Sequence, residues 1–425
     1  GGSAKIAVVA SSLFGSISGS AVSNVASTGV ITIPLMRKSG YDAKTAGAIE
    51  AVASTGGQIM PPIMGAAAFL MAELLELAYT EIILAALIPS LLYYLAVFVQ
   101  ADLEAAKKGI AALPKERIPP MMRVMKEGWF FVVPYVVLIY TLFWMNMAPQ
   151  QAAFWAAVSV GVVSIIFGYK KLRITPKQFI ATFSGCGRMS VDIIIIGAMA
   201  GVIIGILDKT GLGQALTLIL AAIGENNLWL LLILTAIISI LLGMGMPTSA
   251  IYLLLATMIA PSLIKLGVNP ISAHLFVLYF GLMSMITPPV AIAAFAAASL
   301  AGAKPMETGM TAVRLGWIAY IIPFVFVLSP NLLMQGEAVQ VLTALVLACI
   351  GVWIASCGFI GYLFRPIGAA FRLLFVAAGL ALLVPGDAFT YGVAINVTGG
   401  ILAFLLIGRE YMARRNGAVA SPIQS

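Results

Sequence analysis

Long apolar runs with very few charges are the feature that most limits what this chain can fold into. Of its 425 residues, 61% are hydrophobic and only 9% are Asp, Glu, Lys or Arg, whereas a soluble domain carries about 25% charged residues. So few charges cannot cover a surface that faces water, so we expect a surface that faces lipid. In lipid every backbone polar group must be paired within the protein, which leaves helices or a closed barrel. Because the runs are continuous rather than alternating, they predict an all-α integral membrane protein, a polytopic helical bundle.

Several of these apolar runs are interrupted by small residues or by prolines. The interruptions fall at residues 15–20, 56–62, 243–247 and 287–289. A helix needs about 20 residues to cross a bilayer, so several of the pieces are too short to cross alone. The pattern predicts two re-entrant hairpins and two broken helices.

The interruptions belong to an internal repeat. A shift of 227 residues places the first interrupted stretch on the second without a gap and superimposes Pro34 on Pro261, Lys38 on Lys265, Gly40 on Gly267, Ala46 on Ala273, Ile59 on Ile286, and Pro61-Pro62 on Pro288-Pro289. The alternative is that small residues recur by chance in an apolar chain, which ungapped agreement of prolines and glycines disfavours. Following the chain across the membrane gives the two units opposite orientations. Inverted repeats with paired broken helices are typical of secondary transporters whose site lies at the bilayer midplane.

The repeat divides the chain into four parts. Residues 1–75 form the first unit, with a hairpin and a broken helix. Residues 76–226 supply scaffold and connecting helices, 227–303 form the second unit, and 304–425 supply C-terminal transmembrane helices and a tail. The chain does not begin with Met and opens inside an apolar run, so we expect a fragment whose N-terminal part is missing.

Basic residues indicate the orientation. The net charge is +8, and the same path across the membrane puts nearly every Lys and Arg on one side, with Lys209 and Lys265 opposite. The loops at 101–127 and 170–177 and the C-terminus carry most of them: Lys107, Lys108, Lys115, Arg117, Arg123, Lys126, Lys170, Lys171, Arg173, Lys177, Arg409, Arg414 and Arg415. Since cytoplasmic loops are enriched in Lys and Arg, these loops and the C-terminus are predicted to be cytoplasmic.

The interrupted segments suit the binding of small ions and carboxylates. Helices that end inside the membrane leave unpaired N–H groups, which favour a carboxylate, and unpaired C=O groups, which favour a small cation. Hydroxyl and amide groups lie at the same places, among them Ser18, Ser20, Ser23 and Asn24 in the first unit and Thr248, Ser249 and Thr287 in the second. The alternative is that these small residues serve only close helix packing.

Three ionisable residues, Glu50, Asp192 and His274, lie in apolar stretches and therefore need a reason. Asp192 is expected to form an i,i+4 ion pair with Arg188, one turn earlier. Glu50 precedes the first break, and it could bind a cation, carry a proton, or tie the broken helix to its neighbours by hydrogen bonds. We favour the structural tie. His274, the single histidine, is expected to be a packed residue rather than a ligand. No phosphate-binding loop or zinc motif is present, and no catalytic cluster is found, so an enzyme is not expected and no bound cofactor is predicted.

The stretches that carry the repeat also resemble a known family. Residues 15–41 and 48–69, with Glu50, Thr55-Gly56-Gly57-Gln58 and Pro61-Pro62, look like the large membrane subunit of a tripartite ATP-independent periplasmic (TRAP) transporter permease, in the branch served by TAXI-type binding proteins. Gly243–Pro247 and Thr287-Pro288-Pro289 fit the same family. The resemblance covers residues 1–330 and is weaker over the tail at 331–425.

Membership of that family would imply an elevator-type secondary transporter of the bacterial inner membrane. A periplasmic TAXI-type solute-binding protein would deliver the solute, and a small membrane subunit, fused upstream or separate, would complete the permease. Na+ is the expected coupling ion, with H+ as an alternative. The ion sites implied are Ser18, Ser20, Asn24, Thr55 and Gly56 for one ion and Gly243, Gly245, Thr248 and Thr287 for another. The solute, a small organic acid such as a dicarboxylate or a glutamate-like acid, would lie between the tips, near Ser20, Ser23, Asn24, Pro247, Thr248 and Ser249.

Two other functions stay open on the sequence. A stand-alone ion-coupled carboxylate carrier would share the architecture but need no binding protein. A channel or a membrane-embedded enzyme is the more distant alternative.

Overall fold

The chain folds into a helical bundle, which confirms the predicted all-α class. The computed structural model describes residues 1–111, 120–167, 175–224 and 227–415. It is 81% helical, and the described residues contain no β-strand. Within those ranges, 7 helices are long and apolar enough to cross a membrane. The protein is therefore a multi-pass membrane protein.

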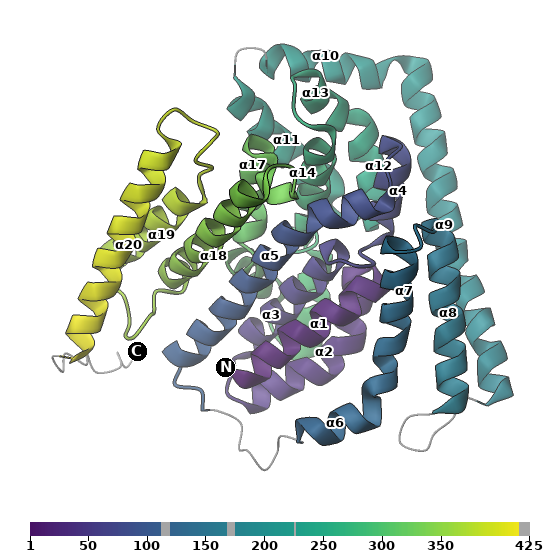
Figure 1. Ribbon diagram of the computed structural model, residues 1–425, viewed down its shortest axis with the longest axis horizontal. Helices are drawn as coiled ribbons and strands as arrows, with labels where there is room; N and C mark the ends of the chain where they lie inside the picture. Colours follow the sequence, from purple (N-terminus) through teal and green to yellow (C-terminus); the bar gives the residue numbers. More distant parts are fainter. Residues whose placement is uncertain (112–119, 168–174, 225–226, 416–425) are drawn as a thin grey trace.

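The helices follow one another with short connections (Figure 1). In chain order they are α1 (Gly2–Ser18), α2 (Ala21–Lys38), α3 (Ala43–Gly56), η1 (Gly57–Ile59), α4 (Ala66–Leu75), α5 (Tyr79–Lys107), α6 (Met121–Gly128), η3 (Trp129–Val132), α7 (Val133–Phe143), α8 (Pro149–Ile166), α9 (Pro176–Thr210), α10 (Leu212–Gly224), α11 (Leu228–Gly243), α12 (Thr248–Met258), α13 (Ala260–Lys265), α14 (Pro270–Met283), α15 (Ile292–Ala301), α16 (Pro305–Leu315), α17 (Ile318–Leu328), η4 (Pro330–Leu333), α18 (Ala338–Ile360), α19 (Ala369–Leu383) and α20 (Gly392–Arg415).

Two helical hairpins turn inside the bundle. The first joins α1 to α2 through Gly19, whose φ of +62° is a backbone conformation that glycine adopts readily. The second joins α11 to α12, with Gly245 at φ +85°. In Figure 1 the first hairpin starts near the N-terminus at the lower edge, whereas α10 and α13, which flank the second, lie at the upper edge. The hairpins therefore enter the bundle from opposite ends.

The helices after each hairpin correspond under the same shift of 227 residues. Residues 43–56 of α3 fall on 270–283 of α14, and the capping side chains Asp42 and Asn269 fall on each other. Both helices are followed by a cis Pro-Pro pair, Pro61-Pro62 or Pro288-Pro289. The structure has α4 ending at Leu75 and α15 at Ala301, next to the predicted boundaries after residues 75 and 303, while residue 226, at the third boundary, lies outside the described residues.

Helix α5 is the element against which much of the rest packs. It contacts α1, α3 and α4 of the first unit, and on another side α18 and η4. Helices α18, α19 and α20 pack on one another in turn, and Figure 1 shows them together at one side of the molecule. Since Tyr93, Tyr94 and Gln100 of α5 are buried, this helix supplies polar groups to its neighbours as well as apolar area.

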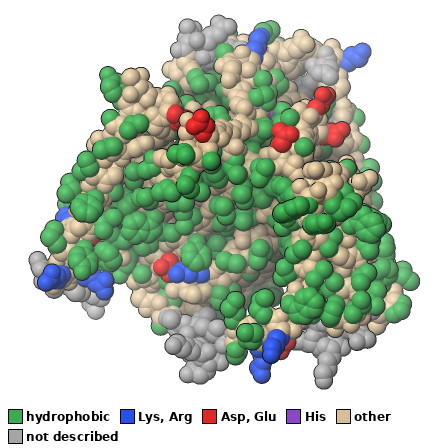
Figure 2. Space-filling model, viewed as in Figure 1, with side chains coloured by type: hydrophobic (Ala, Val, Ile, Leu, Met, Phe, Trp, Pro, Cys, Tyr) green, Lys and Arg blue, Asp and Glu red, His purple; other side chains and the backbone are tan. Residues whose placement is uncertain are grey.

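Charged side chains gather at the two ends of the bundle. Ion pairs join α1, the start of α3, the end of α5 and α16 at one end: Lys5–Asp102 at 2.7 Å, Lys108–Asp42 at 2.7 Å and Arg314–Glu104 at 3.5 Å. At the other end of α5, Glu81 lies near Glu73 and Glu76 at the end of α4. Figure 2 shows a broad hydrophobic band between a lower part where most charged side chains are Lys and Arg and an upper part with Asp and Glu and, at the top edge, further Lys or Arg. Lys115, Arg117, Lys170, Lys171 and Arg173 lie outside the described residues.

We predict that Asp42 stabilises the end of the bundle where α3 begins, in two separable ways. Its carboxylate caps α3 by accepting from the Thr45 N–H at 2.7 Å and also pairs with Lys108. Asp42→Ala should lower the free energy of unfolding by about 1–2 kcal/mol, whereas Asp42→Asn, which keeps a cap, should cost about 0.5 kcal/mol. Denaturation in detergent at pH 7 measures both.

The pH dependence of the free energy of unfolding provides a check on the contribution of the Asp42 charge. Burial by itself would raise the pKa of Asp42, but hydrogen bonds from Lys108 and Thr45 outweigh it and lower the pKa to about 2. A lowered pKa stabilises the fold above the unfolded value of 3.8, and this contribution disappears as the pH falls toward about 2. Equal losses of unfolding free energy in Asp42→Ala and Asp42→Asn at pH 7 would contradict a capping role that is separate from the ion pair.

Candidate functional site

The end of α3 is held by three side chains from two other helices, α5 and α2. The carbonyl groups of three successive residues receive donors from outside the helix: Tyr93 Oη donates to Val52 O at 2.7 Å, Tyr94 Oη to Ala53 O at 2.7 Å, and Asn24 Nδ2 to Ser54 O at 3.4 Å. The last carbonyls of a helix lack partners within it. Here, inside the membrane, neighbouring side chains supply donors.

Asn24 joins the first hairpin to this break. Its side chain is fully buried, and its Nδ2 also donates to Ser11 O of α1 at 2.8 Å. The α1 backbone can come this close because Gly15 and Gly57 lie against each other. A Cβ on Gly15 would lie 2.8 Å from Gly57 Cα and 2.5 Å from Asn24 Nδ2. The first unit therefore presents a compact set of carbonyl and amide oxygens.

Behind Asn24 lies Glu50, which is fully buried in the middle of α3. Its carboxylate accepts from Ser11 at 2.7 Å, Thr28 at 2.5 Å, Thr32 at 2.5 Å and Ser54 at 3.1 Å. These hydroxyls come from α1, α2 and α3. The carboxylate thus ties the broken helix to both arms of the hairpin, in line with the structural role that we favour from the sequence.

In the second unit, hydroxyl groups bond the main-chain carbonyls at the helix break. Ser284, which follows α14, donates to Gly281 O at 2.6 Å and contacts Gly243 O at 2.9 Å. Thr287 donates to Met283 O at 2.6 Å and contacts Tyr320 Oη at 2.7 Å. Gly243, at the end of the first arm of the second hairpin, therefore lies beside the break just as Gly15 lies beside Gly57.

Gln58 connects the two hairpins. With its amide turned so that each atom faces a complementary group, Nε2 donates to Gly19 O at 3.1 Å and to Thr248 Oγ1 at 2.5 Å, and Oε1 accepts from the Ala21 N–H at 3.2 Å. Ala21 is the first residue of α2 and Thr248 the first of α12. Two helix N-termini, one from each unit, therefore meet at a single side chain.

Comparison with known proteins agrees with this arrangement. Residues 1–341 match the family model described as tripartite ATP-independent periplasmic transporter, DctM component. The chain belongs to this family. It is therefore a component of a solute transporter, and not an enzyme.

The curated relatives of this chain are named for several different substrates. This chain is 26% identical over 332 residues, 77% of its own length and 75% of the relative, to the C4-dicarboxylate TRAP transporter large permease protein DctM of Pseudomonas aeruginosa. It is 24% identical over 330 residues to the sialic acid large permease SiaM of Vibrio cholerae, covering 76% and 73% of the two chains. It is 24% identical over 311 residues to the isethionate permease DctMQ of Oleidesulfovibrio alaskensis, covering 72% and 47%.

The structure of this DctM chain brings only some of the predicted site residues together. Asn24 lies against the end of α3, where Thr55 and Gly56 are buried, and Thr248 touches the first tip through Gln58. Thr55 donates to Ala51 O within its own helix at 2.8 Å. Gly56 lies against the ring of Tyr93.

The other predicted residues lie in or near the turns. Ser20 caps α2 by accepting from the Ser23 N–H at 3.4 Å, and Ser18 contacts Ser20 O at 3.5 Å. Ser23, Gly245 and Pro247 are exposed, and Ser249 is half-buried. In the second unit, Gly243 is buried beside Ser284 and Thr287 is half-buried.

Three of the hydroxyl residues around Glu50 are absent from the residues that the sequence singles out: Ser11, Thr28 and Thr32. Ser54 and Gln58, in contrast, belong to the polar groups expected at the first break. One signal was available, because Asn24, Thr28 and Thr32 repeat every four residues and so share one face of α2. Nothing in the sequence indicates that Ser11 lies on the same cluster.

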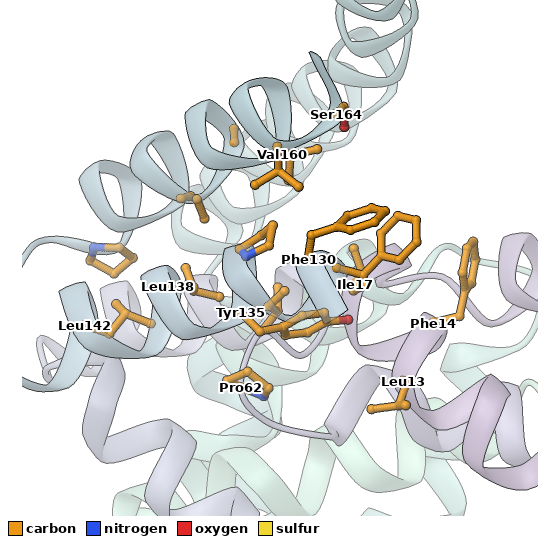
Figure 3. Close-up of a pocket in the computed structure, with 18 of the residues that line it drawn as sticks. Leu13, Phe14, Ile17, Pro62, Phe130, Tyr135, Leu138, Leu142, Val160 and Ser164 are labelled. Carbon is orange, nitrogen blue, oxygen red and sulfur yellow. The ribbon is translucent and has the colours of Figure 1, made fainter. Parts of the chain in front are cut away.

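An apolar cavity lies beside the tip and differs in character from it. Its volume is about 620 Å³, and it lies between α1, the Pro61-Pro62 break and α7–α8. Figure 3 shows Leu13, Phe14 and Ile17 on one side and Leu138, Leu142 and Val160 on another. Because the lining is almost wholly hydrocarbon, a charged organic acid would lose its hydration there without replacement. The polar tips suit such a solute better.

We predict that the contact between Gly15 and Gly57 is needed for the first unit to pack. Gly15→Ala should lower the stability by about 1–3 kcal/mol, because a Cβ would overlap Gly57 and Asn24. Gly408→Ala in α20 is the matched control, since a Cβ there meets nothing within 4 Å. Thermal unfolding in detergent compares the two, and equal midpoints would show that the close approach is not required.

Proposed function

We propose that this DctM chain is the large permease of a transporter that takes up a small organic acid, a dicarboxylate or a glutamate-like acid, together with Na+. The observation that carries the proposal is the meeting of the two hairpin tips at Gln58, with the N-termini of α2 and α12 on either side. Helix N-termini attract anions through free N–H groups and the helix dipole. The relatives named for C4-dicarboxylates, sialic acid and isethionate all take organic acids.

The ion would bind beside the solute, at the two helix breaks. In the first unit the carbonyls of Ser11 and Ser54 converge on the Asn24 amide. Turning that amide over would bring Oδ1 beside the two carbonyls and create an oxygen set for a cation. In the second unit, rotation of the Ser284 and Thr287 hydroxyls would expose Gly243 O, Gly281 O and Met283 O. Thr55, Gly56 and Gly245 belong to the same breaks by sequence.

Partners follow from membership of a tripartite family. A periplasmic solute-binding protein, of the TAXI type by the resemblance of residues 48–69, would deliver the acid, and a small membrane subunit would complete the permease. The end of the bundle with Lys5, Lys108 and Arg314 would face the cytoplasm, because basic residues favour that side. The acidic end with Glu73, Glu76 and Glu81 would then face the periplasm of a bacterial inner membrane, where the binding protein docks.

The alternative is a stand-alone ion-coupled carboxylate carrier. A reconstitution experiment separates the two proposals. Full-length transporter in liposomes is given labelled organic acids, with or without an inward Na+ gradient and with or without its binding protein. Uptake that requires both supports the proposal. Uptake that needs no binding protein favours the alternative carrier, and the absence of solute uptake under every gradient would refute both.

We predict that Asn24→Ala and Thr287→Ala raise the Na+ concentration needed for half-maximal uptake. Each substitution removes an oxygen from a proposed ion site, so an increase of about tenfold, equivalent to about 1.4 kcal/mol, is expected. Ser27→Ala and Thr343→Ala are controls, because both side chains are exposed and lie away from the breaks. If both site variants keep the Na+ dependence of wild type while the protein stays folded, the ion sites lie elsewhere.

A further inference from the structure

The last three helices form a groove that lies apart from the hairpin tips. Helices α18 and α20 both pack on α19, and Figure 1 shows the three together at one side of the molecule. A cavity of about 700 Å³ lies between α18 and α20, and its lining begins only at Val325. We call it the α18–α20 groove. The family match ends at residue 341, so most of the groove is built from residues that the family model does not cover.

The α18–α20 groove follows the long direction of both helices. Its lining extends from Val339 to Ile354 on α18 and from Val393 to Ile407 on α20. These stretches cover about 15 residues of each helix, or about 22 Å at a rise of 1.5 Å per residue. The lining is mostly hydrocarbon, and both helices are long and apolar enough to cross a membrane. The groove therefore suits a hydrocarbon chain that lies parallel to the two helices.

One end of the groove carries an acidic side chain that polar neighbours hold in place. Asp387, in the turn between α19 and α20, belongs to the lining. Its Oδ2 accepts from Ser329 Oγ at 2.9 Å and from Asn331 Nδ2 at 2.8 Å, and both donor residues are buried, at 2% and 8% exposure. Neither bond uses Oδ1, and no Lys, Arg or His in the described part of the chain pairs with this carboxylate. Oδ1 therefore remains available to a positively charged donor.

Asp387 lies at the depth of the lipid headgroups. Its partner Asn331 is in η4, which comes directly before α18, so Asp387 lies at the end of the bundle where α18 begins. Helix α18 ends at the opposite side of the membrane, where Lys107 of α5 donates to Ile360 O at 2.8 Å. Since α18 crosses the hydrocarbon core between these two places, a side chain beside its start is level with the polar headgroups of one leaflet.

We propose that the α18–α20 groove binds a phospholipid with a primary ammonium headgroup, of the phosphatidylethanolamine type. An acyl chain lies between α18 and α20, and the ammonium group donates to Asp387 Oδ1 in a charge-assisted hydrogen bond. Charge complementarity selects this headgroup, because a glycerol headgroup has no cation and a choline headgroup has no N–H to donate. The other role open to Asp387 is a hydrogen-bonded tie between the α19–α20 turn and η4. That tie needs only an acceptor, which asparagine would supply equally well.

Lipid binding to the purified full-length protein tests the headgroup. After co-purified lipid is removed, phosphatidylethanolamine, phosphatidylcholine and phosphatidylglycerol with identical acyl chains are titrated, and bound lipid is measured by native mass spectrometry. Wild type should bind phosphatidylethanolamine about tenfold more tightly than the other two, equivalent to about 1.4 kcal/mol. Asp387→Asn, which keeps an acceptor for Ser329 and Asn331, should lose this preference. Glu73→Gln, at an exposed carboxylate near the end of α4, should keep it.

A second variant tests the acyl-chain part of the groove. Gly400 lies in the lining about half-way along α20, and a Cβ there would make only an ordinary contact, 3.9 Å from Leu382 Cδ2. In Gly400→Leu the rest of the side chain would occupy the groove, so all three lipids should bind more weakly. Gly408→Leu is the matched control on the same helix, because Gly408 is outside the lining and a Cβ on it meets nothing within 4 Å.

Several results would overturn the lipid site. Equal affinity of wild type for the three lipids would exclude an ammonium site, and this measurement needs no variant to fold. A preference that survives in Asp387→Asn would place the headgroup elsewhere. If Gly400→Leu leaves lipid binding unchanged but releases the small membrane subunit, a helix of that subunit fills the groove instead. None of these measurements involves solute uptake, so the lipid site and the proposed function stand or fall separately.

Discussion

Backbone pairing in the absence of water is the constraint on which the rest of this structure depends. A helix that stops inside a bilayer leaves N–H and C=O groups that no solvent can satisfy. This chain stops helices at Gly19, Gly56, Gly243 and Met283 and surrounds each stop with side chains from elsewhere. Asn24, Tyr93, Tyr94, Gln58 and Ser284 each bond a main-chain group at or next to these stops. Buried polar side chains are thus present at each place where a helix breaks.

The two units meet the constraint with different chemistry, although their helices correspond closely. The position of Gly57 in the first unit corresponds to Ser284 in the second, and that of Ser54 to Gly281. In the first unit two glycines allow the backbones to touch, and an asparagine bonds both. In the second unit a serine hydroxyl fills the space and bonds the carbonyls of Gly243 and Gly281. The repeat therefore preserves the position of a break more strictly than the groups that satisfy it.

Local sequence rules explain why the breaks were predictable and the cluster around Glu50 was not. Proline and glycine restrict or free the backbone wherever they occur, so Pro61-Pro62, Pro288-Pro289 and Gly19 mark interruptions without knowledge of the fold. The family match to residues 1–341 confirms the resemblance that those motifs carry. Ser11 and Glu50 are 39 residues apart and meet only because α1 and α3 pack together. Gln58 and Thr248 are 190 residues apart, so no spacing rule could pair them.

The position of Glu50 suggests why a transporter of this kind would keep a carboxylate where a neutral side chain would cost less. A neutral amide could accept with its single oxygen from the hydroxyls at one Glu50 oxygen and donate with its NH2 group to Thr32, and it would avoid burying a charge. A carboxylate has two acceptor oxygens and no proton of its own, so all four hydroxyl groups can donate to it at once. These donors come from α1, α2 and α3, and an amide in the same place would have to give up some of these bonds. The buried carboxylate therefore fixes both arms of the first hairpin to the broken helix more completely than a neutral side chain of the same shape could.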